Sequence, residues 1–420
     1  MPMSRSGSRT RPEVLLPLTL LAALFALVLV VTGCTVPVPT GSAGETTPGV
    51  ETSDAPAPAE LTVTPADGAT DVEIRDGVSA SVENGTITEA VLTNDAGLEI
   101  DGTISTDGTE WAPDIPLGYG RTYTLEITYT GETGGPQTDT RSFTMANPQS
   151  VVGVNLVTTG GAPLESGREY GVGIVVAAEF DQPVADRDLV EEYMTVSTTP
   201  EVDGNWFWVN ASTAHWRPKD YYETGTEVEV DIDIEGRKLG GGQWGGGDAS
   251  VDFTIGERRV TIADDATKTV SVYHNQELVK TMPTSMGKGG WATYGDVTMH
   301  FWTQPGTYTV LDKASSVLMD STTYGLPLSA GYRTTVAHGV RISNNGIYFH
   351  AMPSTVWAQG NTNTSHGCLN LSSADAEWYF DQATTGDVVE IRGTGGPELE
   401  QWKNGDWSVP WEVWQTGSAD

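Results

Sequence analysis

The sequence has little cysteine and little positive charge, and both scarcities exclude classes of protein. Its 420 residues contain two cysteines, Cys34 and Cys368, which allow at most one disulfide and cannot form a zinc site with four thiolates. Lys and Arg number 22 against 56 Asp and Glu, a net charge of −34 that repels phosphate backbones and argues against a nucleic-acid partner. Charged residues make up 19% and hydrophobic residues 38%, a balance typical of globular domains, and the length predicts roughly two to four of them.

The first 34 residues have the pattern of an export signal. Arg5, Arg9 and Arg11 precede an apolar run at 15–31, and small residues follow before Cys34. The ending Val-Thr-Gly-Cys resembles a bacterial lipobox, in which the cysteine becomes the lipidated first residue of the mature protein. We therefore expect a lipoprotein signal peptide at 1–33, a lipid on Cys34 and a location outside the cytoplasm. A plain membrane-spanning anchor is the alternative.

A tether is expected directly after Cys34. Residues 34–58 are rich in Pro, Thr, Ser, Gly, Ala and acidic residues and have no periodic apolar pattern. If Cys34 carries a lipid, Cys368 is the only free thiol of an exported protein. An unpaired thiol outside the cell is open to oxidation, so its presence favours a reactive nucleophile, with a buried inert cysteine as the alternative.

Two units of strands and turns are predicted at 59–148 and 149–256. In the first, apolar residues at 123, 125, 127 and 129 alternate with polar ones; in the second, those at 228, 230, 232 and 234 alternate with acidic ones. Such alternation places one face in a core and the other in water. Both units are interpreted as small β-sandwiches that act as spacers or contact the cell wall.

Two features of the second unit resemble functional sites only superficially. The glycine-rich segment 240–247 lacks the lysine and the following helix of a phosphate-binding loop, so we expect a mobile hairpin tip. His215 stands beside Trp216 without other chemistry-bearing neighbours, so we expect it to be packed and not catalytic.

The third unit, 257–398, holds five of the six histidines and Cys368. Short apolar strands and one helix that starts at Ser372 or Ser373 predict a mostly antiparallel β-domain with one short helix. The tail 399–420 carries Trp402, Trp407, Trp411 and Trp414 in polar surroundings. We expect these indoles to dock on the preceding domain, because burial of each is worth about 2 kcal/mol. A platform for wall glycans is the alternative.

The residues around Cys368 predict acyl transfer. A thiol with an ordinary pKa needs a base, and His366 lies two residues before Cys368 while His350 lies eighteen before it. Gly367 permits a close backbone approach, so the amides of Gly367 and Cys368 are candidate donors to an oxyanion. The alternative, a Cys/His metal site, has little support because the sequence has no CxxC and no HExxH motif.

The motif Ser-His-Gly-Cys-Leu-Asn at 365–370, with His350 upstream, resembles the L,D-transpeptidases that have a YkuD-type catalytic domain. The resemblance extends to 319–327, 331–334 and 358–364. It is strongest with the mycobacterial and actinobacterial subgroup, whose members carry two immunoglobulin-like domains before the catalytic domain and a Trp-rich C-terminal subdomain. The fold this implies is mostly β: Ig-like sandwiches at 59–148 and 149–256, a catalytic domain at 257–398 and the subdomain at 399–420.

The resemblance also implies roles for individual residues. Cys368 is the nucleophile, His350 is its general base, and the backbone carbonyl of Ala351 orients the imidazole. The amide of Gly367 serves the oxyanion. Substrate contacts are implied for Tyr324, Tyr332, Met319, Trp302, Ser365, His366 and Asn370. No metal and no cofactor are implied. Ser354 stands where close relatives often have tryptophan, which alters the implied wall of the site.

The implied activity is peptidoglycan cross-linking. The Cys368 thiolate attacks a tetrapeptide stem at its third residue, releases D-Ala and forms a thioester, and an amine of a second stem resolves the thioester into a 3→3 cross-link. Carbapenems are expected to acylate the same thiol. Hydrolysis of the thioester, which would make the protein an L,D-carboxypeptidase, and a non-catalytic wall-binding lipoprotein are the alternatives. The partners implied are stem peptides and, through Cys34, the outer face of the cytoplasmic membrane, with the chain a monomer that reaches into the wall.

Overall fold

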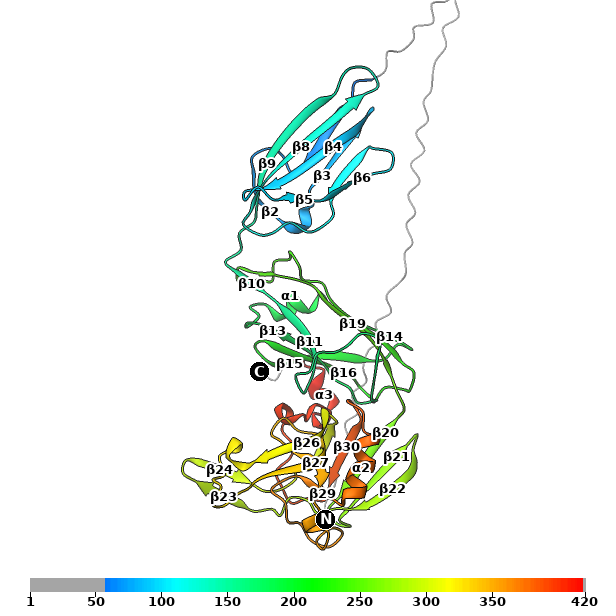
Figure 1. The fold of residues 1–420 in the computed structure, drawn as a ribbon, viewed down its shortest axis with the longest axis vertical. Coiled ribbons are helices and arrows are strands. Elements are labelled where there is room, and N and C mark those ends of the chain that lie inside the picture. The colour runs from blue at the N-terminus through cyan, green and yellow to red at the C-terminus, as the bar shows by residue number, and fades with distance from the viewer. Residues whose placement is uncertain (1–56, 418–420) are drawn as a thin grey trace, which may run out of the picture. The chain divides into compact units, whose positions relative to one another are not determined.

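The computed structural model describes residues 57–417, in which strands predominate and three short α-helices occur (Figure 1). The expected signal peptide, Cys34 and nearly all of the expected tether lie outside the described residues. Within 57–417, no helix is long and apolar enough to cross a membrane. The strands form three successive groups, which we call the first sandwich, the second sandwich and the third unit. The predicted mostly-β class is confirmed.

The first sandwich consists of two sheets, with strand orders β1-β3-β7-β6 and β2-β9-β8-β4-β5. On β8, Tyr123, Leu125 and Ile127 are buried in the core between the sheets, and the polar residues between them face outward, as the alternation predicted. Its strands are β1 (Glu60–Thr64), β2 (Ala69–Val72), β3 (Ser79–Glu83), β4 (Gly85–Asn94), β5 (Glu99–Ile100), β6 (Gly102–Ile104), β7 (Glu110–Pro113), β8 (Thr122–Gly131) and β9 (Gln137–Met145).

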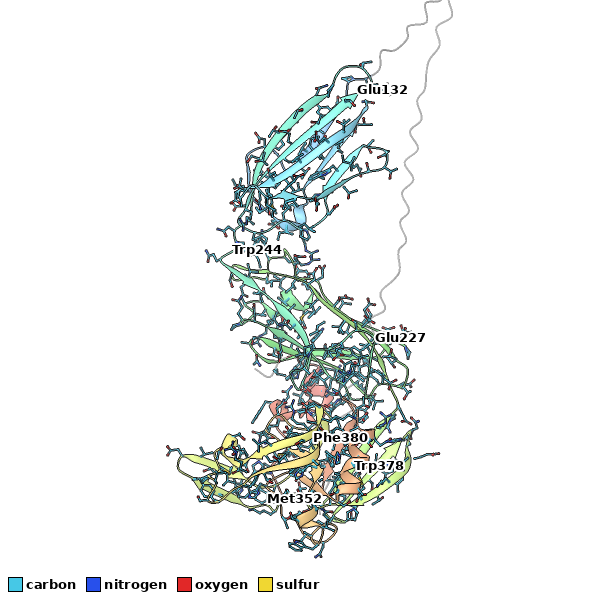
Figure 2. The ribbon with its side chains drawn as sticks, in the orientation of Figure 1. Glu132, Glu227, Trp244, Met352, Trp378 and Phe380 are labelled. Atoms are coloured by element: carbon cyan, nitrogen blue, oxygen red, sulfur yellow. The ribbon has the colours of Figure 1, made fainter. Side chains whose placement is uncertain are left out.

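The second sandwich has two four-stranded sheets, β11-β13-β16-β15 and β12-β19-β17-β14, and a small β10-β18 pair. On β17, Val228 and Val230 are buried while Glu227, labelled in Figure 2, and Glu229 are exposed, which confirms the predicted pattern. Its elements are β10 (Ser150–Val152), β11 (Val154–Thr158), β12 (Arg168–Tyr170), β13 (Val176–Phe180), α1 (Arg187–Glu191), β14 (Met194–Thr199), β15 (Gly204–Asn210), β16 (Thr213–Pro218), β17 (Glu227–Ile232), β18 (Gln243–Gly245) and β19 (Ala249–Ile255).

The glycine-rich segment is a tight turn joined to a strand. Gly240, Gly241 and Gly242 have φ values of 77°, 55° and 80°, a region that favours glycine, and the Gln243 amide donates to the Gly240 carbonyl. The chain then continues directly as β18, which pairs in parallel with β10. The predicted turn is present, but Gly245 lies in β18 and the Gly246 amide donates to the Val152 carbonyl, so these two glycines do not form a free tip.

The third unit contains a five-stranded sheet β22-β21-β20-β30-β25, a four-stranded sheet β26-β27-β28-β29 and the separate hairpin β23-β24. Helix α2 packs on β27 and β28, and Ser372 caps it by accepting from the Asp375 amide, as predicted. Figure 2 labels Trp378 and Phe380 on this helix. The elements are β20 (Arg259–Asp264), β21 (Thr269–His274), β22 (Glu277–Pro283), β23 (Trp291–Tyr294), β24 (Val297–His300), β25 (Gly306–Thr309), β26 (Asp312–Asp320), β27 (Arg333–Arg341), β28 (Tyr348–Ala351), β29 (Leu369–Leu371), α2 (Ser373–Gln382), β30 (Val388–Arg392) and α3 (Trp411–Trp414).

The tryptophan-rich tail contacts both preceding units. Asn404 and Ser408 bond to the third unit, as expected, whereas three of the four indoles contact the second sandwich, which was not expected. The indole N–H of Trp407 donates to the Gly173 carbonyl, and that of Trp414 donates to the Asn205 carbonyl, both at 2.8 Å. The buried guanidinium of Arg217 lies over the rings of Trp407, Trp411 and Trp414 at 4.7, 5.4 and 4.4 Å. A desolvated cation over aromatic faces is attractive, which explains the choice of partner. The fourth indole, Trp402, is 61% exposed.

His215 takes part in the same docking. Its Nδ1 lies 3.0 Å from Oδ1 of Asp406, in the tail segment η5 (Asp406–Ser408). The imidazole therefore joins the tail to the second sandwich, in line with the prediction that it is packed.

Candidate active site

Strands β28 and β29 bring His350 and Cys368 together. The two strands pair in parallel, with Phe349 opposite Leu369 and His350 opposite Asn370, and Cys368 directly precedes β29. Nearly all residues of both strands are buried, and β28 pairs with β27 on its other side. Residues eighteen positions apart in the sequence therefore come to the same end of the sheet, where both line one cavity.

His350 is held in one orientation by its own neighbour. Its side chain is 3% exposed, and Nδ1 lies 3.1 Å from the carbonyl oxygen of Ala351. A carbonyl can only accept, so Nδ1 carries the proton and Nε2 is left as an acceptor. Burial lowers the pKa of His350, and the Ala351 carbonyl opposes that shift in part. The imidazole is consequently neutral at pH 7 and able to take a proton.

Cys368 is a buried thiol in its protonated form. It is 9% exposed, and burial raises its pKa to about 11, against a smaller lowering by the backbone amide of Tyr348. The thiol donates to the carbonyl of Gly346 at 3.7 Å. The resting site therefore contains a neutral thiol and a neutral imidazole, not a preformed ion pair.

Cys368 lies between two cavities. The first, of about 200 Å³, also contains His350 and is lined by Met319, Tyr332, Thr334, His350, Met352, Thr355, Thr364, Ser365, His366, Cys368 and Asn370. The second, of about 250 Å³, is lined by Val297, Thr298, Met299, His300, Trp302, Tyr324, Tyr332, Asn345, Gly346, Ile347, His366, Gly367, Cys368, Trp402 and Lys403. Tyr332, His366 and Cys368 belong to both, so the thiol can be reached from two sides.

The structure brings the predicted site residues together around these cavities. Met319, Ser365 and Asn370 line the first cavity, and Trp302, Tyr324 and Gly367 line the second. Tyr332 and His366 line both. The hydroxyl of Tyr324 donates to that of Tyr332 at 3.2 Å, and burial raises the pKa of both phenols. Ser354 is exposed and lines neither cavity.

The predicted role of the Gly367 amide stays a prediction, and the structure shows this amide bonded within its own loop. Its N–H donates to Oγ of Ser365 at 3.1 Å and so is already engaged within the loop. Oγ of Ser365 in turn donates to the Cys368 carbonyl at 2.6 Å. Gly367 has φ +146°, a conformation that favours glycine, and this turn is what allows the loop to fold back on Ser365. Ser365 therefore shapes the loop.

His366 is unsuited to act as the base. Burial, and to a smaller extent the nearby Lys288 ammonium, lower its pKa to about 4. Its Nε2 lies 3.0 Å from Nζ of Lys288, which can only donate, so this nitrogen is already occupied. The ring packs edge-on against Phe301 at 4.9 Å and lies 5.2 Å from the ring of Tyr332. His366 therefore forms a wall between the cavities, and its surroundings favour His350 of the two candidate bases.

Asn370 leaves one acceptor available in the first cavity. Its Nδ2 donates to Oγ1 of Thr355 at 3.3 Å, while Oδ1 has no hydrogen-bond partner among residues 57–417 although it is buried. An unpaired buried acceptor is costly unless a ligand supplies a donor. Asn370 itself is among the residues that line the first cavity.

Several contacts around the thiol were not predicted from the sequence. Gly346 and Tyr348 touch the thiol through their backbones, and Thr303 contacts the Gly367 carbonyl through its side chain. Backbone contacts have no sequence signature, and Thr303 lies 64 positions from its partner. Among residues 57–417, no group of three or more His, Cys, Asp or Glu side chains is arranged to hold a metal ion.

Comparison with known proteins gives one consistent result. Residues 258–391 match the L,D-transpeptidase catalytic domain family, YkuD, and residues 69–238 match a bacterial Ig domain family. The chain is similar to L,D-transpeptidase 2 of Mycobacterium tuberculosis strain CDC 1551 / Oshkosh, with 38% identity over 86% of this chain and 85% of the relative. It is also similar to L,D-transpeptidase 5 of Mycobacterium tuberculosis strain ATCC 25618 / H37Rv, with 35% identity over 90% and 80% of the two chains. A solved LD transpeptidase in complex with imipenem is 32% identical, with a TM-score of 0.45, over 54% of this chain and 95% of that chain.

Proposed function

Since the chain belongs to the family of L,D-transpeptidases with a YkuD catalytic domain, we propose that it forms 3→3 cross-links between peptidoglycan stem peptides through a thioester on Cys368. The observation that carries the proposal is the placement of one free thiol between two cavities, with an oriented neutral imidazole in one of them. A transferase with a covalent intermediate needs room for a donor and for an acceptor at the same atom.

Proton transfer accompanies the attack. Because the pKa of Cys368 is raised to about 11 and that of His350 is lowered, a thiolate–imidazolium pair is unfavourable in the resting site. The thiol proton therefore passes to Nε2 of His350 as sulfur approaches the substrate carbonyl. The Ala351 carbonyl stabilises the resulting imidazolium because it accepts from Nδ1.

Acylation makes one bond and breaks one. The sulfur of Cys368 bonds to the carbonyl carbon of the third stem residue, and the carbonyl electrons move to oxygen. When they return, the bond to the D-Ala nitrogen breaks and His350 gives that nitrogen its proton. Both the leaving nitrogen and the later incoming amine must reach His350, so we place them in the first cavity. The acyl chain then extends along Trp302 and Tyr324 in the second.

The second half-reaction repeats these steps in reverse. A side-chain amine of another stem enters the first cavity, loses a proton to His350 and attacks the thioester carbon. The carbon–sulfur bond then breaks, and His350 returns the proton to the departing sulfur. The free Oδ1 of Asn370 is available to accept a hydrogen bond from this amine or from a neighbouring peptide N–H. If water attacks instead, the product is a free tripeptide and the enzyme is an L,D-carboxypeptidase.

A carbapenem should acylate the same thiol. The relative solved with imipenem supports this, because it shares the family with this chain. A strained β-lactam carbonyl offers sulfur the same reaction, with the ring nitrogen as the leaving group.

We further propose that a lipid on Cys34 attaches the protein to the outer face of the cytoplasmic membrane and that the sandwiches extend the third unit into the wall. The support is the lipobox-like sequence at 31–34. Metabolic labelling with a palmitate analogue should mark the wild-type protein and leave Cys34→Ala unlabelled; equal labelling of both would contradict the anchor.

Product analysis tests the proposed activity. Incubation of the purified protein with a tetrapeptide stem should give a cross-linked dimer and free D-Ala, detected by mass spectrometry, and Cys368→Ala should give neither. Tripeptide without dimer would replace transfer by hydrolysis. Undiminished dimer from Cys368→Ala would refute the proposed chemistry.

A further inference from the structure

The backbone around the thiol has one unassigned polar group. Residues 367 and 368 present two N–H groups and two carbonyls. The Gly367 N–H donates to Ser365, the Cys368 carbonyl accepts from Ser365, and the Gly367 carbonyl accepts from Oγ1 of Thr303 at 2.6 Å. The fourth group, the Cys368 N–H, has no hydrogen-bond partner in the part of the chain that the structure describes. A free N–H on the nucleophile itself is a suitable donor to an oxyanion.

The Thr303 contact determines where that N–H points. The Gly367 carbonyl and the Cys368 N–H belong to one planar, trans peptide unit, so they point in opposite directions. A hydrogen bond that fixes the carbonyl on one side therefore fixes the N–H on the other. Gly367, with φ +146°, would otherwise give this peptide more rotational freedom than other residues allow.

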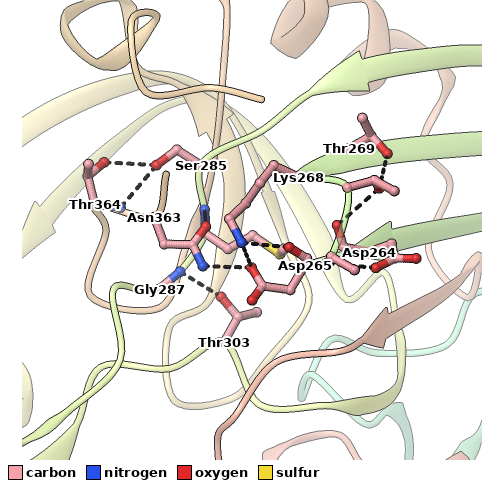
Figure 3. A network of polar contacts seen from close by, with 12 residues as sticks. Asp264, Asp265, Lys268, Thr269, Ser285, Gly287, Thr303, Asn363 and Thr364 are labelled. Carbon is pink, nitrogen blue, oxygen red and sulfur yellow. Dashed lines mark hydrogen bonds and ion pairs between the residues drawn. The ribbon is translucent and has the colours of Figure 1, made fainter. Parts of the chain in front are cut away.

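Thr303 is itself held tightly. It is fully buried, and its Oγ1 accepts from the Gly287 N–H at 3.0 Å (Figure 3). The same oxygen donates its proton to the Gly367 carbonyl. The single hydroxyl proton is thus committed to the Gly367 carbonyl. A Cβ at position 287 would lie 2.3 Å from the Phe301 carbonyl oxygen and 2.5 Å from the Thr303 nitrogen, so only glycine permits this approach.

We propose that Thr303 is a positioning residue for the oxyanion site: its hydroxyl holds the Gly367–Cys368 peptide so that the Cys368 N–H meets the developing negative charge. The inference rests on the proposed function, because it requires Cys368 to attack a carbonyl. A hydrogen bond to the Gly367 oxygen also polarises the peptide, which strengthens the N–H at its other end as a donor.

The size of the effect can be bounded. Removal of a direct oxyanion donor slows the chemical step by about 100- to 1000-fold. Thr303 acts through another residue, so its loss should cost less, on the order of 10- to 100-fold. Because the contribution is made in the transition state, the loss should appear in the rate of acylation at saturation and not in the affinity for the acylating compound.

The test compares two reactions of the same thiol. Acylation by imipenem passes through an oxyanion, whereas alkylation by iodoacetamide joins sulfur to carbon with loss of iodide and forms none. Thr303→Val keeps the shape of threonine without its hydroxyl, and Thr303→Ser keeps the hydroxyl. We expect Thr303→Val to acylate 10- to 100-fold more slowly than wild type, on the order given above, with alkylation within about twofold. Thr303→Ser should restore acylation to within about threefold.

Three outcomes would overturn the proposal: unchanged acylation in Thr303→Val, equal slowing of acylation and alkylation, or no rescue by Thr303→Ser. Equal slowing would mean that the loop has moved and that Thr303 is only structural. Thermal unfolding establishes that each variant is folded, and Thr303→Ala, read by the same ratio of rates, replaces Thr303→Val if the valine variant does not fold.

The wild-type reaction separates this proposal from the proposed function. If imipenem does not acylate Cys368 of the wild-type protein, both fail together. If the wild type is acylated and Thr303→Val behaves identically, the enzyme assignment stands and only the positioning role is lost.

Discussion

The two sides of Cys368 are built differently. On one side lies the nucleophile loop, residues 362–368, whose polar groups are bonded to neighbouring segments. Asn363 donates to Asp265 at 2.6 Å and accepts from the Met286 amide at 3.1 Å, and Thr364 is bonded to Ser285 (Figure 3). On the other side lies the hairpin β23-β24, residues 291–300, which forms a sheet only with itself.

The loop holds Cys368 in place, whereas the hairpin forms an adaptable entrance to the second cavity. A two-stranded hairpin is marginally stable alone, and this one exposes Trp291 by 62% and Val297 by 44%, with Val297 on the edge of the second cavity. In the proposed mechanism the loop positions the reacting sulfur, where small displacements are costly. The hairpin exposes apolar side chains at the entrance to the second cavity. A long substrate can gain apolar contact there, and its exact position matters less than at the thiol. Substitutions in the loop should therefore change the rate of chemistry, and substitutions in the hairpin should change binding.

The largest effect on the rate of acylation is expected from substitution of His350, the proposed general base. His350→Asn removes the proton acceptor and should slow acylation by imipenem about 100- to 10,000-fold, measured as adduct formation by intact-protein mass spectrometry. His338→Asn is the matched control, because His338 lies on β27 outside both cavities and has φ 55°, which asparagine tolerates. Equal losses in both variants would show that His350 has no special role.

The next largest effect is expected in the rate of alkylation of Cys368, which depends on the protonation state of its thiol. Since burial raises the pKa of Cys368 to about 11, two units above the ordinary 9.0, its alkylation by iodoacetamide near pH 8 should be about 100-fold slower than that of a free cysteine and should rise up to about pH 11. Acylation needs neutral His350, whose pKa is lowered, so it should persist at pH 7 and decline only below about 6.5. An alkylation profile with a midpoint near 8.5 would contradict the neutral resting pair.

A weaker loop should slow the chemistry. Asn363→Ala removes the bonds to Asp265 and Met286 and should reduce the acylation rate about tenfold with little change in binding, as a misplaced nucleophile does. Asn361→Ala is the matched control, because the exposed Asn361 makes only a backbone hydrogen bond. Stopped-flow fluorescence with increasing imipenem separates the two parameters. If Asn363→Ala weakened only the affinity for imipenem, the proposed difference between the loop and the hairpin would be wrong.

The smallest effect is expected at the hairpin. Trp291→Ala should raise the KM for a stem substrate about threefold and leave kcat within about twofold, because a half-exposed aromatic contact is worth about 0.5–1 kcal/mol. Trp357→Ala is the matched control. Trp357 is 69% exposed and lies outside the hairpin, whereas Trp291 packs against His300 and Trp302, which line the second cavity. Steady-state dimer formation provides both constants. A fall in kcat alone would mean that the hairpin takes part in the chemistry.

Sequence predicted the site best where chemistry and strand pattern coincide. Residue type and motif predicted Cys368 and His350 as site residues. The family resemblance predicted the contact between His350 and the Ala351 carbonyl. Helix α2 and its Ser372 cap were predicted from local rules alone. The alternation on β8 and β17 likewise gave the buried faces of both sandwiches.

What sequence could not provide depends on contacts between distant segments. The hydrogen bond from the Gly367 amide to Ser365 depends on how the loop folds back, which no local pattern reveals. Thr303 gains its position from a close approach at Gly287, and no local pattern reveals that approach. The tail's tryptophans were predicted to be docked, but the partner, Arg217 of the second sandwich, is nearly two hundred residues away.

The most direct test of the account is the site of the covalent intermediate. The protein is incubated with imipenem or a tetrapeptide stem, quenched in acid, digested and mapped by tandem mass spectrometry. We predict a single acyl adduct, on Cys368, formed by the wild type and by Trp291→Ala and absent from Cys368→Ala. An adduct on any other residue, or one that persists in Cys368→Ala, would contradict the account.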